Sequence, residues 1–304
     1  MRHALALGIG LATCALAAGA RGANGDELLD APAPPTLPAL AHKDLRFTFE
    51  YTAASIEPNA PAGAGGRSYA WFAHTDLELP IVPRKWYMGL AYDTAAATVP
   101  GIGRDFFPGN PELTARGLWS STQGFSAGGG LGIVLPVPRE LAPDQATILR
   151  AARSIRPWDA AYFTDLTLTF RPSFDIRHVT GRFILQLRQG IDWSIALPRA
   201  KASGPGSDLT ARATFYIGYR AAEPVGIGLE LWEVYQLTAD VPDDKRAAFA
   251  VSPSIRFILP RVQPALSVLV PLSTPLRGDV ASYYGARFNV SFDFERRRAE
   301  PVGK

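Results

Sequence analysis

Apolar and polar residues alternate along most of this chain, in runs of about ten to fifteen residues separated by turn signals. Between Phe183 and Ile195, for example, the apolar side chains occupy one face, while Arg182, Gln186 and Arg188 occupy the other. Strict alternation is typical of a β-strand whose two faces meet different surroundings. Eleven such runs are visible, at 45–51, 69–78, 85–93, 115–137, 165–177, 182–195, 212–220, 225–239, 247–259, 262–272 and 284–294.

The length of the runs favours a membrane barrel over a soluble β-sandwich. Sandwich strands usually have about five or six residues, whereas a tilted strand needs about 9–11 residues to cross a bilayer. The polar face is heavily charged, as in a wet lumen. Tryptophan and tyrosine lie toward strand ends on the apolar face, as in the interfacial girdles of membrane barrels: Trp71, Trp86, Trp193, Tyr219 and Tyr284. The pattern therefore predicts an all-β fold, a transmembrane antiparallel up-and-down β-barrel.

The number of strands depends on the stretch between residues 115 and 160. Bacterial single-chain barrels have an even number of strands, with short periplasmic turns and longer outer loops. A tight turn at Gly128-Gly129-Gly130 would divide 115–137 into two strands and give twelve. The alternative is ten strands, with one N-terminal run misinterpreted as a strand. With twelve strands, 138–160 becomes a long outer loop, in which Asp144 to Arg156 predicts a short helix capped by Asp144 and ended by Pro157.

The two ends of the chain do not show this alternation of apolar and polar residues. Residues 1–23 read as an export signal, with a basic start, an apolar run from Ala4 to Ala18 and small residues for cleavage. Residues 24–43 form a proline-rich lead-in, placed in the periplasm. The barrel then covers 44–294, and 295–304 is a polar tail. Cys14 is the only cysteine, so removal of the signal leaves a protein without disulfides or zinc-thiolate sites; lipidation of Cys14 is the alternative.

The charged residues argue against a nucleic-acid partner, and the basic ones among them are mostly arginine. The formal net charge of +3 includes Arg2 and Arg21 of the export signal, so the mature chain is nearly neutral. A nucleic-acid partner is not expected, because a basic surplus clustered on one face is missing. The basic residues are mainly arginine, whose planar head suits paired, partly buried charge. No cofactor is expected.

The last run resembles the C-terminal signal strand of Gram-negative outer-membrane β-barrel proteins. Its aromatic side chains alternate and end in phenylalanine, at Tyr284, Phe288, Phe292 and Phe294. The resemblance implies export to the bacterial outer membrane, recognition by the barrel assembly machinery, contact with lipid and lipopolysaccharide, and an envelope protein as a further possible partner. The tail 295–304 departs from the pattern, because members of this family usually stop at the aromatic residue. The preceding stretch, 263–273, is similar to small outer-membrane channels for aromatic or hydrophobic compounds.

Candidate chemistry is sparse. The mature chain has three histidines, and none stands in a short motif with serine of the kind that nucleophilic enzymes use. His74, Asp76 and Glu78 share the polar face of one strand; a hydrogen-bonded lumen cluster is predicted, with a metal site and a catalytic base as alternatives. Metal ligands and a catalytic set are otherwise not expected. The glycines at 128–132 lack the lysine of a phosphate loop, so they indicate a turn or close packing.

The polar face supplies the candidate lumen. It carries both signs of charge in similar numbers, at Arg46, Arg171, Arg177, Arg182, Arg188, Arg212, Arg220, Arg256 and Arg287, and at Glu50, Asp76, Glu78, Asp93, Asp165, Asp175, Asp192, Glu230 and Asp293. These charges either neutralise one another and stiffen a narrow barrel or form facing walls that orient a solute. A barrel of this size is narrow, so we expect a small solute or a lumen partly filled by 138–160 or by the lead-in.

Three functions follow from these features. The first is a passive channel for small or amphipathic solutes. The second is a non-conducting structural barrel that binds an envelope partner. The third is a lipid-modifying enzyme that depends on His74.

Overall fold

The computed structural model describes residues 42, 44–58, 66–121, 124–198, 207–238, 242, 245–273 and 280–294. The export signal 1–23, the lead-in apart from His42, and the tail 295–304 lie outside the described residues. The strands are β1 Leu45–Pro58, β2 Ser68–Val82, β3 Trp86–Val99, β4 Gly103–Pro108, β5 Glu112–Ser120, β6 Phe125–Val134, β7 Thr167–Thr180, β8 Phe183–Ala196, β9 Ser207–Ala222, β10 Val225–Gln236, β11 Ala247–Phe257, β12 Val262–Pro271 and β13 Val280–Phe294. The helices are α2 Pro143–Ser154 and the 3₁₀ helix η1 Pro157–Phe163.

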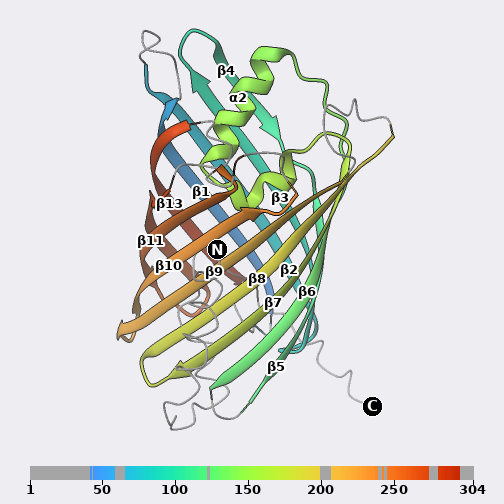
Figure 1. Ribbon diagram of the computed structural model, residues 1–304. Coiled ribbons are helices and arrows are strands. Elements are labelled where there is room, and N and C mark those ends of the chain that lie inside the picture. Colours follow the sequence, from blue (N-terminus) through green and yellow to red (C-terminus); the bar gives the residue numbers. More distant parts are fainter. Residues whose placement is uncertain are drawn as a thin grey trace.

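Twelve of these strands close into an antiparallel barrel (Figure 1). Each strand pairs with its neighbours in sequence, and β1 closes the ring by pairing with β13 from Leu45–Phe294 to Pro58–Val280. β4 is not counted as one of the twelve strands. It pairs with the outer half of β3, and β5 pairs with the inner half of β3. The predicted twelve-strand barrel is confirmed, and the alternative of ten strands is wrong.

The alternation in the sequence becomes the two faces of the wall. On β10, Ile227, Leu229 and Leu231 are 46%, 44% and 42% exposed, while Glu230 and Trp232 between them are buried in the lumen. Large apolar side chains cover the outside in this way along other strands as well. Such a surface is unfavourable in water but matches a lipid environment. Among the helices of the described residues, none is long and apolar enough to cross a membrane.

The turn predicted at Gly128-Gly129-Gly130 is wrong. The three glycines lie within β6, paired with β5 and β7, and the chain turns between Ser120 and Phe125 instead. The reason is steric: a Cβ at Gly130 would lie 2.7 Å from the Ala115 carbonyl oxygen and 2.7 Å from the Arg116 Cβ. Glycine is used here for close strand contact beside a large lumen side chain, rather than for a turn.

This packing gives a direct test. Gly130→Ala should destabilise the barrel by about 1–3 kcal/mol, the usual cost of overpacking, because its Cβ meets backbone and side chain of β5. Gly129→Ala is the matched control, since its Cβ would approach nothing closer than the Ser173 carbonyl oxygen at 3.2 Å. Urea unfolding of the two variants in detergent measures the difference. Equal stabilities would contradict the close-packing role.

The predicted helix is present, but its start is shifted. α2 begins at Pro143 with Ala142 at the N-cap, so Asp144 lies in the first turn and does not cap the helix as expected. Gln145 instead bonds back to the Ala142 amide at 3.1 Å. The 3₁₀ helix η1 follows at Pro157 and was not anticipated; it carries buried residues into the barrel.

Candidate functional site in the barrel lumen

The connections between strands define the two ends of the barrel. Short turns after β2, β7, β9 and β11 lie at one end, which we assign to the periplasm, and the segment with α2 and η1 lies at the other. α2 packs against β2, β3 and β4, and η1 packs against β10. The loop after β6 therefore does not extend away from the barrel; it folds back into the outer half of the lumen. We call this inward segment, residues 141–163, the plug.

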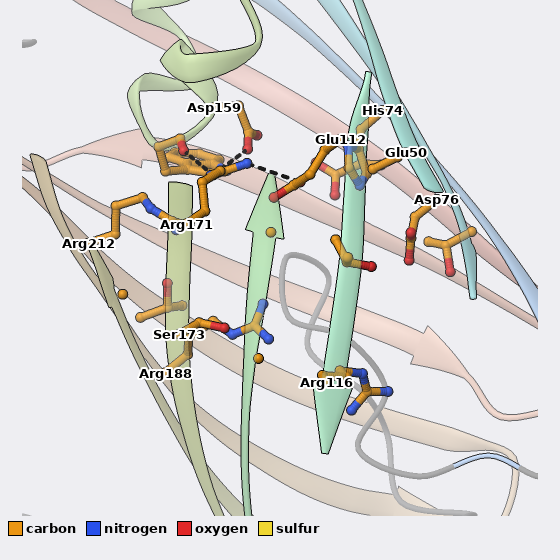
Figure 2. Close-up of a pocket in the computed structure, with 18 of the residues that line it drawn as sticks. Glu50, His74, Asp76, Glu112, Arg116, Asp159, Arg171, Ser173, Arg188 and Arg212 are labelled. Carbon is orange, nitrogen blue, oxygen red and sulfur yellow. Dashed lines mark hydrogen bonds and ion pairs between the residues drawn. The ribbon is translucent and has the colours of Figure 1, made fainter. Parts of the chain in front are cut away.

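A cavity of about 190 Å³ lies in the lumen below η1. One wall is basic and the other is mainly acidic (Figure 2). Arg171, Arg188 and Arg212 come from the adjacent strands β7, β8 and β9. The acids come from β1, β2 and β5, at Glu50, Asp76, Glu78 and Glu112, and this wall also carries Arg46 and Arg116. Glycines on the inward faces of β6 and β8, including Gly130 and Gly190, leave the space between these walls.

Arg156 fixes the inward segment to the barrel wall. Its guanidinium bonds to Glu50 of β1 and to Asp159 of η1, at 2.5 Å for Asp159, and it lies 4.6 Å from the centre of the Phe72 ring. Burial alone would raise the pKa of Asp159, but the guanidinium groups of Arg156 and Arg171 lower it below its usual value. Asp159 is therefore ionised at neutral pH, and the plug is held by charged contacts.

Arg171 on β7 is bonded to several partners at once, on the barrel wall and in the plug. Its side chain bonds to Asp192 of β8 at 3.0 Å, to Glu112 of β5 at 3.3 Å and to the carbonyl oxygen of Trp158 in η1 at 3.0 Å. The guanidinium also lies 4.7 Å from the centre of the Tyr162 ring. Tyr162 in turn donates its hydroxyl hydrogen bond to Glu112. One arginine thus connects the plug with three strands.

A second cavity of about 740 Å³ lies on the outer side of this cluster, between α2, η1 and the outer ends of β7 to β10. Asp192 lines this outer cavity, and Arg171 and Arg212 line the inner one. Asp192 pairs with both, at 3.0 Å and 2.7 Å. These three side chains separate the two cavities and mark the constriction of the lumen.

The candidate cluster of His74, Asp76 and Glu78 divides among different partners. All three line the lumen cavity from β2, but His74 pairs with Asp93 of β3 at 2.5 Å and Glu78 pairs with Arg116 of β5. Asp76 faces the cavity and is not hydrogen-bonded to His74 or Glu78. Within the described part of the chain, no group of three or more potential metal ligands is brought together.

The remaining candidates form a second set of pairs along the lumen. Asp175 and Arg188 share two hydrogen bonds of 2.7 and 2.9 Å, and Arg46 binds Asp293 in the same two-bond manner, at 2.6 and 2.8 Å. Glu230 and Arg287 pair at 2.7 Å, both fully buried. Arg256 differs, because it bonds to neutral oxygens, those of the Asn289 side chain and the Gln263 backbone. Asp165 lies in the connection before β7 rather than on a strand, and its carboxylate accepts a hydrogen bond from the Arg139 backbone amide.

The lead-in contributes one described residue to the lumen. His42 is buried, and its ring lies 2.6 Å from Glu78 and packs on Tyr87 at 4.6 Å between ring centres. It therefore stands at the periplasmic end, on the side of the cavity opposite η1.

The aromatic residues of the last strand face away from the lumen. Tyr284, Phe288 and Phe294 are 63%, 38% and 51% exposed on β13, and Phe292 packs beside Phe294 and Phe47. They belong to the lipid-facing surface of the closing seam with β1. Their role as an assembly signal remains a prediction.

Several lumen residues were not among the candidates from the sequence, namely Glu112, Arg116, Arg156, Asp159 and Tyr162. The first two lie on β5, where the alternation of Leu113 and Ala115 with Glu112, Thr114 and Arg116 is visible but starts before the expected strand. The other three belong to the segment after β6, for which the sequence left an outer loop or a partial filling of the lumen by 138–160 open. A buried arrangement of Trp158 and Tyr162 could not be recognised from periodicity.

Similarity to known structures agrees with this architecture. Neither a protein-family model nor a curated protein matches the sequence. An outer-membrane channel from Pseudomonas putida F1 superposes with a TM-score of 0.62 at 10% identity, covering 86% of this chain and 100% of that one. The porin NanC superposes with a TM-score of 0.52 at 10% identity, covering 82% and 100%. The chain has the fold of outer-membrane β-barrel channels. At 10% identity this similarity concerns the fold alone. It is the fold that the resemblance of the last strand to outer-membrane proteins implied.

Proposed function

We propose that the protein is a passive channel of the bacterial outer membrane, for small solutes that pass a charged lumen. The observation that carries this proposal is the cavity between an arginine wall on β7 to β9 and a mainly acidic wall on β1, β2 and β5, where Arg46 and Arg116 also lie. Facing walls of opposite charge create a transverse field, which orients a dipolar or charged solute without binding it permanently. In that setting the barrel contacts lipid and lipopolysaccharide and is inserted by the assembly machinery.

The inward segment sets the size of the permeant in this proposal. The lumen narrows where η1 meets Asp192, Arg171 and Arg212, between the inner and outer cavities. A cavity lies on each side of this point, so a modest displacement of η1 would join the two cavities. This arrangement supports a channel with low conductance in its resting state.

The alternative is a sealed structural barrel that binds an envelope partner. The observation that favours it is the completeness of the plug contacts, because Arg156 and Arg171 satisfy carboxylates from three barrel strands and from η1. A lipid-modifying enzyme has less support, since the ring of His74 is bonded to Asp93 and to no serine in the described residues.

Conductance separates channel from sealed barrel. The purified full chain in planar lipid bilayers should show small, discrete current steps, and a variant with 141–163 replaced by a glycine-serine linker should show larger ones. Folding of both is checked by the shift in gel mobility on heating. A correctly folded linker variant without any current would overturn the channel proposal and leave the sealed barrel.

A further inference from the structure

Two arginines differ from the other buried arginines of the described lumen in having no carboxylate partner. Arg177 on β7 and Arg256 on β11 are 1% and 4% exposed. Within the described residues neither forms an ion pair, and the Nε and Nη2 atoms of Arg177 and the Nε atom of Arg256 lack a hydrogen-bond acceptor. By contrast, Arg46, Arg188 and Arg287 are each matched with an acid. An uncompensated buried cation is costly, so its retention calls for an explanation.

These arginines lie in the periplasmic half of the lumen. Arg177 stands three residues before the end of β7, and Arg256 stands one residue before the end of β11. Arg177 is directly opposite Gln186 of β8 in the sheet register, and Gln186 is opposite Tyr216 of β9. Both amide atoms of the buried Gln186 also lack partners. Unused donors from neighbouring strands therefore gather on one level of the wall.

Tyr216 connects the two arginines. It interacts electrostatically with both guanidinium groups. Its ring lies flat against the wall because Gly218 and Gly228 leave room for it; a Cβ at Gly218 would lie 2.6 Å from the Tyr216 oxygen. Arg46 acts on both arginines as well, but its own charge is matched by Asp293. Glu230 and Glu50 attract Arg256 from a distance, but their ion pairs are with Arg287 and Arg156.

We propose that Arg177 and Arg256, with Gln186 and Tyr216, form an anion-binding site that takes solutes bearing a carboxylate or phosphate group. Guanidinium groups bind both kinds of oxyanion through charge-assisted hydrogen bonds. Arg256 lines the inner cavity and so stands on the solute's path. That the ligand is a passing solute rests on the proposed channel function, but binding itself can be measured without conductance.

Binding is tested with inorganic phosphate on the detergent-solubilised full chain at constant ionic strength. Phosphate should raise the Tm, and Arg177→Gln or Arg256→Gln should weaken its affinity by about tenfold or more, as expected when a charge-assisted hydrogen bond is lost. Without phosphate, Arg177→Gln should be at least as stable as the wild type, because an unmatched buried charge is removed. Arg182→Gln is the control, since it removes an exposed positive charge near the same end of the barrel.

Two results would overturn the proposal. One is a phosphate effect that is equal in Arg177→Gln and Arg182→Gln; the other is a loss of stability in phosphate-free Arg177→Gln, which would indicate a structural role. Ion selectivity provides the second readout: a potassium chloride gradient across a bilayer should give a chloride preference that falls in Arg177→Gln. Phosphate binding without any current would sink the channel function and leave the site intact, whereas current without arginine-dependent phosphate binding would do the reverse.

Discussion

Replacing Arg156 by alanine is expected to convert the protein from a low-conductance to a high-conductance barrel. The guanidinium holds η1 against the wall by bonding Glu50 and Asp159 together. Without it, two buried carboxylates face each other and repel. Removing one partner of a buried ion pair costs about 3–5 kcal/mol, and even the lower figure changes the ratio of docked to undocked plug by about a hundredfold.

The measurement is single-channel current in planar bilayers, with folding verified by heat-dependent gel mobility. Arg150→Ala is the matched control: Arg150 lies exposed on α2 at the outer cavity and bonds to Thr147 of the same helix at 3.1 Å, so its loss should not release the plug or produce the large current. Glu50→Gln combined with Arg156→Ala should release the plug less, because one of the repelling charges is gone. A folded Arg156→Ala protein with wild-type current would show that η1 does not limit passage.

The barrel itself could be predicted from the sequence because its physical cause is local. A strand between lipid and lumen must alternate, and residues such as Leu229, Glu230 and Leu231 show this directly. Strand number was predictable for a related reason, since loop lengths distinguish the two ends of the barrel. The position of the turn was not, because Gly128 to Gly130 have the composition of a turn, and their close contact with β5 is visible only once the strands are paired.

A lumen partly filled by 138–160 was one of the expectations, but the sequence could not decide between this and a loop outside the barrel. The segment 141–163 has helix signals that say where α2 forms, but not on which side of the barrel rim it folds. Its direction depends on partners far away in the chain: Asp159 meets Arg171, and Trp158 packs on Trp232 at 4.1 Å between ring centres. Likewise, the sequence places His74, Asp76 and Glu78 on one face, but it does not reveal that His74 and Glu78 each select a partner on another strand.

Arg171→Ala should cause the largest loss of stability among single substitutions in the lumen. It removes the cation shared by Glu112 and Asp192, and it also removes the donor to the Trp158 carbonyl oxygen. Glu112 then loses its paired cation, whereas Asp192 keeps Arg212. Breaking a buried ion pair by removing one partner costs about 3–5 kcal/mol. Urea unfolding followed by tryptophan fluorescence measures the loss in the detergent-solubilised protein. Arg220→Ala is the control, because Arg220 donates to the Glu223 carbonyl at the exposed inner turn and should cost little.

Combining Arg171→Ala with the removal of the plug shows how this energy is divided. If Arg171 stabilises mainly the wall, through Asp192 on β8 and Glu112 on β5, the substitution should cost the same with and without residues 141–163. Since its guanidinium also binds the Trp158 backbone and lies over the Tyr162 ring, we expect a smaller cost once the plug is absent. The difference between the two costs is the coupling energy between plug and wall. A coupling of zero would contradict the role of Arg171 at the constriction, because the plug would then be held by Arg156 and its own packing.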